Sequence, residues 1–563
     1  MRWNLKPKPE REKVDQLARE LQVEEPIASL LVQRGIENFE QAKKFFRPSL
    51  SDLHDPFLMK DMDRAVSRIL EALERNENML IFGDYDVDGT TSVALVWEFL
   101  SRFTSNLATY IPDRYIEGYG ISYQGIDFAH DNDITLIIAL DCGIKAIDKV
   151  KYAKEKGIDF IICDHHLPGS MIPDAVAVLD PKREDCPYPF KELCGCGVGF
   201  KLIQALAQKL HVELSELIPL LDLVATAIGA DIVSVTGENR ILTYFGLQVI
   251  NSNPRTGFQA ILEMVKKKKL TVTDVVFIIA PRINAAGRMK HANHAVALLI
   301  ERCLTQARQY AKEIEEFNKE RRDKDKQITE EALLQIVENR EEERHTTVVY
   351  HESWHKGVLG IVASRLTETY YRPTLVFTKS GERLAASARS VVGFDVYTAL
   401  EHCAEHIEQF GGHKFAAGLT LLEEKFDHFK NAFEDIVSKT IDKRLLIPEI
   451  EIDAILNFND ITPKFYRIIK QFAPFGPDNP LPVFMTSNLR STGASRVVGT
   501  DGKHLKLMMQ QNNSSTFSGI GFNLGHKFPS ISDGTPFQIA YCLDENEWQG
   551  EVSIQLRVKD IRT

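Results

Sequence analysis

The sequence predicts an α/β protein that has a parallel sheet in its first half and a β-barrel at its end. Three observations support this class. From Asn78 onward, short apolar segments alternate with helical ones, which is typical of a parallel sheet covered on both faces. Residues 301–344 are dense in charge and contain no glycine or proline, which favours one long helix. After Ile447, apolar and polar residues alternate, as in Glu551–Val558, which indicates antiparallel strands.

The length and composition indicate a soluble protein of several domains. A chain of 563 residues is too long for one core. Its 68 basic and 79 acidic residues give a net charge of -11, which argues against a broad cationic surface but leaves room for a narrow basic groove. We find no apolar run long enough to span a bilayer and expect no membrane partner. The eight cysteines are scattered, and the one cluster, Cys186, Cys194 and Cys196, lacks the spacing of a zinc site, so we expect a cytoplasmic protein.

The periodicity divides the chain into five expected parts. Short helices at the start include Glu10–Leu21 and Phe39–Phe46. The expected division is 1–50 for this helical segment, 51–300 for the parallel-sheet domain, 301–345 for the connecting helix, 346–445 for a second α/β domain and 446–563 for the barrel.

Acidic and imidazole side chains follow several apolar segments of the first domain. The carboxyl ends of parallel strands meet at one crevice, so we expect these side chains to lie together. A single aspartate there is often only a helix cap, but a set of five is hard to explain in that way. Mixed carboxylate and imidazole ligands suit Mn²⁺ or Mg²⁺, and adjacent carboxylates that can bridge suggest two ions. The expected ligands are Asp84, Asp86, Asp141, His165 and Asp231.

The segment that begins at Asp84 has two other readings. Its D-x-D-x-D-G string imitates an EF-hand loop, but the twelfth position holds Leu95 instead of glutamate. A P-loop is excluded because Thr90 follows Gly89 where a lysine is needed. A plain Asp-Gly turn stays open on this segment alone. We expect Asp88, which has no assigned partner, to order the turn into the following helix.

These motifs resemble a known superfamily. Asp84-Tyr85-Asp86, Asp141-Cys142-Gly143, Asp164-His165-His166 and the Asp231 segment resemble the ordered motifs of the DHH phosphoesterases. Further segments resemble the RecJ single-stranded-DNA exonucleases, and the match runs through nearly the whole chain: Ala280–Arg288, Trp354–Arg365, Gly411–Gly418 and Pro474–Pro480.

The resemblance implies a 5′-to-3′ exonuclease of DNA repair and recombination that releases mononucleotides with two Mn²⁺ or Mg²⁺ ions. It implies that the sheet domain is a DHH domain, the second α/β domain a substrate-binding DHHA1 domain and the barrel an OB-like DNA-binding domain. Single-stranded DNA is the expected partner, a single-strand-binding protein and a helicase are candidate partners, and a monomer is expected.

The family pattern also implies roles for individual residues. One ion would bind to Asp86, Asp141, His165 and Asp231, and the second near Asp84 and the bridging Asp141. His166 would face the scissile phosphate, with Asp164 supporting its neighbours. Some relatives have a histidine shortly before the first aspartate, but this chain has Leu80-Ile81-Phe82, so we expect the second ion to be held more loosely.

The resemblance further implies a set of DNA contacts. Guanidinium groups suit a terminal phosphate, and glycines in polar loops such as Ala386–Ser390 and Gly411–Lys414 let backbone N–H groups approach one. The phosphate-binding candidates are Arg114, Arg282, Arg288, Ser364, Arg389, Gly411, Gly412 and His413. In the barrel, a stacking and phosphate surface is expected from Phe475, Lys503, His504, Lys506 and Phe522.

Two other functions stay open. A DHH phosphodiesterase could act on short oligoribonucleotides or cyclic dinucleotides, but those relatives do not usually need the C-terminal barrel. An inactive scaffold that binds single strands should lack some metal ligands, and this chain has the full set.

Overall fold

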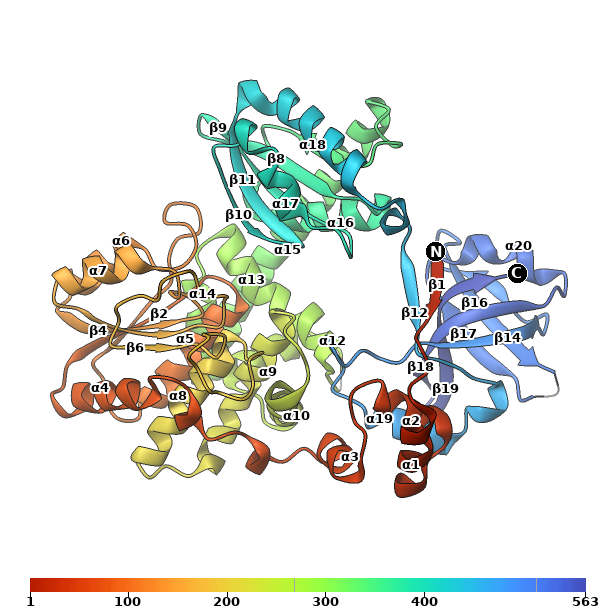
Figure 1. Ribbon diagram of the computed structural model, residues 1–563, viewed down its shortest axis with the longest axis horizontal. Helices are drawn as coiled ribbons and strands as arrows, with labels where there is room; N and C mark the ends of the chain where they lie inside the picture. Colours follow the sequence, from red (N-terminus) through yellow and green to blue (C-terminus); the bar gives the residue numbers. More distant parts are fainter. Residues whose placement is uncertain (268, 513) are drawn as a thin grey trace. The chain divides into compact units, whose positions relative to one another are not determined.

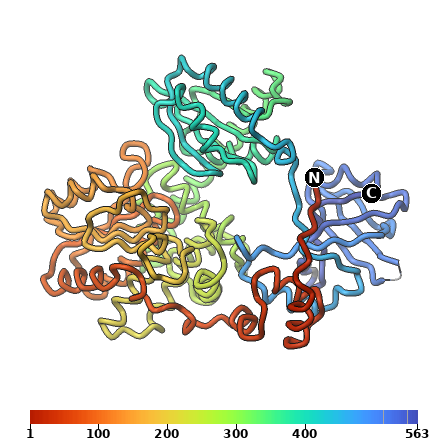
Figure 2. Tube along the Cα trace, in the orientation of Figure 1, coloured from red at the N-terminus to blue at the C-terminus, as the bar shows by residue number. Residues whose placement is uncertain are grey.

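The computed structural model describes residues 1–267, 269–512 and 514–563 (Figure 1). The chain forms two compact units, which the trace in Figure 2 lets the reader follow by colour. The large unit consists of residues 3–287, 291–312 and 450–563, and the small unit of residues 1–2, 288–290 and 313–449. None of the described helices is both long and apolar enough to cross a membrane.

The large unit contains the expected parallel sheet. Its five strands run in the order β3-β2-β4-β5-β6, and every neighbouring pair is parallel. The central strands are apolar throughout because both faces of the sheet are covered. The strands are β2 (Asn78–Gly83), β3 (Leu107–Tyr110), β4 (Ile134–Leu140), β5 (Asp159–Cys163) and β6 (Ala177–Leu179).

Helix α5 (Val87–Leu100) begins directly after β2 and is buried along almost its whole length. Its residues are apolar or small on nearly every side, which is typical of a helix packed between layers. The other helices of this part of the chain are α4 (Met62–Glu74), α6 (Tyr123–Asp131), α7 (Ile147–Glu155), α8 (Gly195–Lys209), α10 (Gly237–Ser252), α11 (Thr256–Glu263), α12 (Val272–Asp274), α13 (Ala280–Met289) and α14 (Asn293–Ile300).

One segment grouped with the sheet strands is a helix. Residues 220–230 were expected to deliver Asp231 as a strand end does, but they form α9 (Leu221–Ala230), and Asp231 is its C-cap. A continuous apolar run of this length fits a buried helix as well as a strand. The helix also packs closely: a Cβ on Gly246 of α10 would lie 2.2 Å from the Leu221 carbonyl oxygen. The sequence therefore predicts that Asp231 follows an apolar segment, but it does not predict that this segment is a helix.

The large unit also contains the expected barrel. Strands β14, β18, β19, β17 and β16 form a closed ring, because β14 also pairs with β16. All pairs in the ring are antiparallel except β17 with β19. The strands are β13 (Ala454–Ile455), β14 (Phe484–Ser491), β15 (Arg496–Val498), β16 (His504–Gln511), β17 (Phe517–Gly521), β18 (Phe537–Trp548) and β19 (Glu551–Arg562), with helices α19 (Pro463–Lys470) and α20 (Pro529–Ser532).

The N-terminal helices share one apolar core with the barrel. Leu17, Ile27 and Leu31 lie in the same buried cluster as Phe465 and Leu507. The segment contains β1 (Arg2–Leu5), α1 (Arg11–Leu21), α2 (Glu25–Val32) and α3 (Phe39–Phe46), close to the expected bounds.

The small unit begins within the long helix α15 (Leu304–Glu338) and contains a mixed sheet of order β10-β11-β9-β8-β7. Only β7 and β8 are parallel. The elements are β7 (Thr347–Tyr350), β8 (Thr374–Ser380), β9 (Arg383–Arg389), β10 (Gln409–His413), β11 (Ala416–Leu422), β12 (Glu449–Ile452), whose Ile450–Ile452 lie in the large unit, α16 (Leu359–Tyr370), α17 (Val396–Glu401) and α18 (Phe426–Thr440).

The two polar loops expected in this unit are largely strands. Ala386–Arg389 belongs to β9, where Ala386 and Ala388 are buried, and Gly411–His413 belongs to β10. Their small residues resemble turn signals, but in the sheet they pair in register with β11.

Candidate active site

The connection from β2 to α5 is compressed against the helix. A Cβ on Gly89 would lie 2.3 Å from the Asp84 carbonyl oxygen, so only glycine fits there. The Asp86 side chain caps α5 by accepting a hydrogen bond from the Gly89 backbone N–H (3.0 Å). The three aspartates of this segment therefore do not line one side of an extended chain, because the last of them already lies in the helix.

Asp84 is completely buried at the end of β2. Its Oδ1 accepts a hydrogen bond from the Gly120 backbone N–H at 3.3 Å. Its Oδ2 has no hydrogen-bond partner among the described residues. A buried oxygen without a hydrogen-bond partner costs free energy of folding unless a bound group contacts it.

Asp141 follows β4 in a strained conformation. Its φ is +60°, in the left-handed region that is rare for a residue other than glycine. Its N–H donates to the Cys163 carbonyl oxygen (2.8 Å), and its Oδ1 lies 3.2 Å from His165 Nε2. Strain of this kind costs about 1–3 kcal/mol and is concentrated at functional sites.

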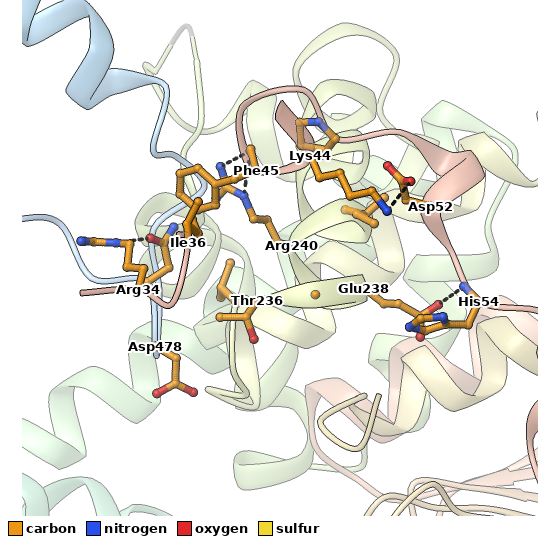
Figure 3. Close-up of a pocket in the computed structure, with 15 residues that line it drawn as sticks. Arg34, Ile36, Lys44, Phe45, Asp52, His54, Thr236, Glu238, Arg240 and Asp478 are labelled. Carbon is orange, nitrogen blue, oxygen red and sulfur yellow. Dashed lines mark hydrogen bonds and ion pairs between the residues drawn. The ribbon is translucent and has the colours of Figure 1, made fainter. Parts of the chain in front are cut away.

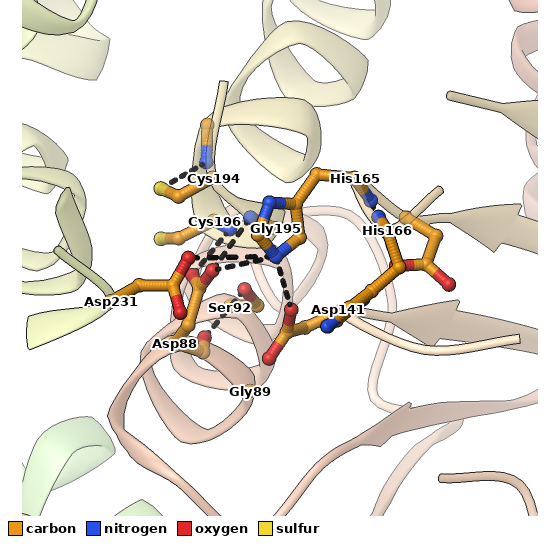
Figure 4. A network of polar contacts seen from close by, with 12 residues as sticks. Asp88, Gly89, Ser92, Asp141, His165, His166, Cys194, Gly195, Cys196 and Asp231 are labelled. Atoms are coloured by element: carbon orange, nitrogen blue, oxygen red, sulfur yellow. Dashed lines mark hydrogen bonds and ion pairs between the residues drawn. The ribbon is translucent and has the colours of Figure 1, made fainter. Parts of the chain in front are cut away.

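His165 is the centre of the cluster in Figure 4. Its Nε2 lies 3.2 Å from Asp141 Oδ1, 3.5 Å from Asp231 Oδ2 and 3.8 Å from Asp88 Oδ2. Burial, together with the charge of His166, lowers the pKa of His165 to about 3. The imidazole is therefore neutral, which is the form that binds metal ions.

Asp88 has a different place from the one expected. It does not stand alone at the turn: its buried carboxylate accepts the backbone N–H groups of Gly195 (2.6 Å) and Cys196 (2.7 Å) at the start of α8. Together with His165 and Asp231, it forms one of the described groups that could hold a metal ion. Asp88 therefore joins the cluster, and Asp86 takes the capping role.

The carboxylates of the cluster are buried or half-buried and repel one another. Burial, followed by the charges of neighbouring carboxylates, raises the pKa values of Asp84 and Asp141 well above their usual range. The same causes raise the pKa of Asp88 to about 7 and that of Asp231 to about 8. A divalent cation would remove this repulsion, and the oxygen and imidazole donors fit Mn²⁺ or Mg²⁺. The donor set therefore fits the expected ions.

A second chain of contacts runs beside the cluster. Asp164 Oδ1 accepts a hydrogen bond from His166 Nδ1 (2.7 Å), and its Oδ2 accepts one from the Ile144 N–H (2.9 Å). Burial opposes a charge on His166, but the contact with Asp164 prevails and raises the pKa of His166 to about 9. His166 Nε2 lies 3.1 Å from the Tyr119 hydroxyl. Asp164 therefore supports a protonated His166.

Sequence reasoning missed three residues at this site. Tyr119 lies between Gly118 and Gly120, whose positive φ values turn the chain toward His166. A Cβ on Gly195 would lie 2.7 Å from Asp141 Oδ1, and a Cβ on Gly287 would lie 2.7 Å from the Tyr85 carbonyl oxygen. The glycines let α8 and α13 approach the cluster. In the sequence, the runs of small residues Cys194–Gly197 and Ala285–Gly287 are the pattern that could have indicated this close packing.

The cysteine cluster serves this same packing. Cys194 Sγ accepts a hydrogen bond from the Gly197 N–H (3.3 Å) at the start of α8. Over the part of the chain that the structure describes, no group that could hold a metal contains a cysteine.

The phosphate-binding candidates fall into both units. In the large unit, the Arg114 guanidinium lies 4.7 Å from the centre of the Tyr85 ring, beside the cluster, and Arg282 Nη1 donates to the Ile278 carbonyl oxygen (2.6 Å). In the small unit, Arg288 Nη1 donates to the Gly357 carbonyl oxygen (3.0 Å).

The other candidates of the small unit lie on α16 and on the sheet. Arg389 Nη1 donates to Ser387 Oγ (3.1 Å), and a Cβ on Gly360 of α16 would lie 2.6 Å from Arg389 Nη2. Ser364, one turn further along α16, donates to the Gly360 carbonyl oxygen. Gly411, Gly412 and His413 are exposed on β10.

Of the expected barrel surface, Lys503 and Phe522 are exposed, whereas His504 and Lys506 are half-buried. Phe522 is 52% exposed and its ring lies 5.4 Å from that of His504 and 5.9 Å from the Arg557 guanidinium. Lys503 pairs with Asp501 (3.0 Å). Phe475 instead packs against the barrel core.

A parallel sheet whose strand ends gather carboxylates and imidazoles around a divalent-ion site defines a metal-dependent phosphoesterase. Comparisons with known proteins agree. Residues 78–228 match the DHH family, N-terminal domain, residues 344–439 the DHHA1 domain and residues 452–560 the RecJ OB domain.

Whole-chain relatives narrow the class further. The chain is 36% identical to the single-stranded-DNA-specific exonuclease RecJ of Bacillus subtilis (100% of this chain, 70% of the relative). It is 34% identical to that of Escherichia coli (98% of each chain). The crystal structure of Thermus thermophilus RecJ in complex with Mn²⁺ has a TM-score of 0.86 at 26% identity and covers 100% of this chain and 79% of that one. The chain belongs to the RecJ family.

Proposed function

We propose that this chain is a single-stranded-DNA exonuclease that hydrolyses phosphodiester bonds from the 5′ end and releases mononucleotides. The observation that carries the proposal is the frustrated acid cluster around His165, in a chain that matches RecJ proteins over its full length. Mn²⁺ or Mg²⁺ is the proposed cofactor, with two ions in each site.

The ligand assignment follows the family pattern. Asp86, Asp141, His165 and Asp231 would hold one ion, and Asp84 with Asp141 the other. When bound, the ions supply an activated water and neutralise charge on the phosphate. Because Leu80-Ile81-Phe82 offers no ligand before Asp84, we expect the second ion to bind more weakly.

Asp88 is a further candidate for the first ion, since its Oδ2 lies 3.8 Å from His165 Nε2. Two backbone N–H groups already bond to its carboxylate, so we expect it mainly to position α8.

His166 is the proposed electrostatic partner of the phosphate. With a pKa of about 9 it is protonated at neutral pH and can donate from Nε2 to a phosphate oxygen that gains charge during cleavage. Asp164 accepts the hydrogen bond of the Nδ1 proton, and a phosphate oxygen would replace the Tyr119 hydroxyl, which lies 3.1 Å from Nε2, as the partner of the Nε2 proton.

The remaining assignments are also proposals. Phosphates of the single strand would contact Arg114, Arg282, Arg288, Ser364, Arg389, Gly411, Gly412 and His413. The barrel would bind the part of the single-stranded DNA that lies beyond the site. The proposed domain boundaries remain at residues 50, 300, 345 and 445. A monomer in the cytoplasm, supplied with DNA by a single-strand-binding protein and a helicase, completes the proposal.

A substrate comparison tests the function. The chain is incubated with Mn²⁺ and a 5′-phosphorylated single strand, the matching blunt duplex, a short oligoribonucleotide or a cyclic dinucleotide. We expect mononucleotides from the single strand and little product from the others. Faster cleavage of the oligoribonucleotide or cyclic dinucleotide would favour the DHH phosphodiesterase, and no cleavage of any substrate would favour the binding scaffold.

A further inference from the structure

A cavity of about 220 Å³ lies beside His166, on the parallel-sheet domain. The residues that line it include Tyr119, Ile121, Ile144, Ala146 and the hydrogen-bonded pair Asp164 and His166. The two isoleucines are buried within the core and contribute apolar wall. The cavity is smaller than the 300–1,000 Å³ typical of sites for drug-sized ligands, so it suits a single flat group.

Two lysines also line this cavity. Lys145 is exposed and Lys149 half-buried, and both line the cavity. Over the described residues neither forms a salt bridge, whereas Lys154, further along α7, pairs with Asp174. Two lysines without acidic partners, next to an apolar cavity, are suited to a ligand that is apolar at one end and anionic at the other.

Helix α7 adds to this positive charge. It has nine residues, and its N-cap, Ala146, lines the cavity. Among the described residues no side chain caps this helix, and the N–H groups of a helix's first turn have no partner within the helix. A helix N-terminus favours an anion by its dipole as well as by these donors.

We infer that this cavity is a nucleotide subsite next to the cleaved bond. One base of the single strand would enter it, against the Tyr119 ring, Ile121 and Ile144, and the phosphate of that nucleotide would lie between Lys145, Lys149 and the start of α7. This inference rests on the proposed function, since it places the substrate of that reaction. A base in this cavity is unstacked and unpaired, so the subsite selects single strands without reference to any other part of the molecule.

The lysines are tested on the full-length chain. We compare wild type, K145A/K149A and the control K151A/K154A, which removes the same charge from exposed positions of α7. Affinity for a 5′-phosphorylated single strand is measured across a range of salt concentrations, with Ca²⁺ replacing Mn²⁺ and cleavage confirmed to be absent.

Each phosphate that is neutralised on a single strand contributes about 0.7 to the slope of log affinity against log salt, so the slope should fall by about 0.7 in K145A/K149A, which loses one phosphate contact. The control should keep the wild-type slope. Equal slopes in both variants would overturn the phosphate assignment. A wild type that neither binds nor, with Mn²⁺, cuts single strands would refute the proposed function instead.

The base is tested with substrates that lack one. An abasic sugar is placed in turn at each of the first three nucleotides, and kcat/KM is measured for the wild type. Loss of one stacked base should lower kcat/KM about tenfold at a single position. In K145A/K149A the same position should still show this loss, since the base contacts remain. Equal cleavage of all abasic substrates would overturn the base assignment.

Discussion

The two five-stranded sheets of this chain present functional side chains in different ways. The first is wholly parallel, and β2, β4 and β5 end directly at Asp84, Asp141 and Asp164. The second is mixed, and its candidates Arg389 and His413 are the last residues of β9 and β10. A parallel sheet sends all its carboxyl ends to one edge, whereas antiparallel neighbours end at opposite edges. In the first sheet, the ends of the adjacent strands β2, β4 and β5 therefore lie side by side. In the second sheet, the antiparallel strand β11 separates the ends of β9 and β10, so Arg389 and His413 are two strands apart.

The acids of the two units differ accordingly. Asp84 and Asp141 are buried, each with an oxygen that lacks a hydrogen-bond partner among the described residues, and their pKa values are raised. In the small unit, Glu434 accepts hydrogen bonds from the backbone N–H groups of His345 (2.9 Å) and Thr346 (3.0 Å). Burial opposes its charge, but these bonds and that from the Thr346 hydroxyl lower its pKa. An acid left unsatisfied at a strand end is suited to a cation, and a satisfied one supports the fold.

A large effect is expected where α8 touches the cluster of the first sheet. Gly195→Ala would place a Cβ 2.7 Å from Asp141 Oδ1 and push α8 or the carboxylate aside. We expect metal affinity and cleavage rate to fall about 10- to 100-fold. The control is Gly197→Ala in the same helix, whose Cβ would approach the Leu193 side chain, at 3.3 Å, and Cys194 Sγ, at 3.6 Å, but not the cluster. Similar losses in the two variants would mean that helix stability, and not the Asp141 contact, is being measured.

A smaller effect is expected on the second sheet. Arg389→Lys keeps the charge but loses the fork of N–H groups that suits a terminal phosphate. The KM for a 5′-phosphorylated strand should rise about tenfold with little change in kcat. The same strand with a 5′-hydroxyl should show no difference between variant and wild type. An equal rise in KM for both strands would show that Arg389 does not recognise the 5′ phosphate.

The frustrated acids should also weaken the metal-free fold. Asp84→Asn removes a buried charge, so in the presence of a chelator the variant should melt a few degrees above wild type, although it is less active. Mn²⁺ should raise the melting temperature of wild type more than that of the variant. If Asp84→Asn melts below wild type in chelator, Asp84 is a structural acid like Glu434.

The smallest effect concerns Glu434. Because its folded pKa is lowered, its contribution to stability is present above the unfolded pKa of about 4.3 and is lost as the pH falls through the folded value. Glu434→Gln should lower the unfolding free energy by about 1 kcal/mol at pH 7, and the difference should shrink below about pH 4. A difference that stays constant from pH 7 to pH 3 in urea titrations would contradict this.

The sequence predicts the parallel sheet well because its strands are local apolar runs, each ended by a polar residue. It also indicates that Asp84, Asp141, His165 and Asp231 lie close together, because the carboxyl ends of parallel strands lie at one edge of the sheet. It does not place Asp88, because its partners at Gly195 and Cys196 are more than a hundred residues away and bond through their backbone.

Other errors have similar physical causes. The Asp231 segment is apolar on every side, so its pattern does not separate a buried helix from a strand. The small residues of β10 resemble a turn, and only pairing with β11 makes them a strand. Tyr119 carries no recognisable motif, and its role depends on a hydrogen bond to His166 across 47 residues.

The central claim is that the acids at the first sheet's edge hold the ions that permit cleavage. We would measure Mn²⁺ binding at equilibrium and mononucleotide release from a 5′-phosphorylated single strand, for wild type and Asp141→Asn. Circular dichroism would first confirm that the variant is folded. We expect wild type to bind Mn²⁺ and cut, and the variant to lose Mn²⁺ affinity and several orders of magnitude in rate, because Asp141 is the proposed ligand of both ions. A folded Asp141→Asn variant that keeps its Mn²⁺ affinity and its rate would contradict the account.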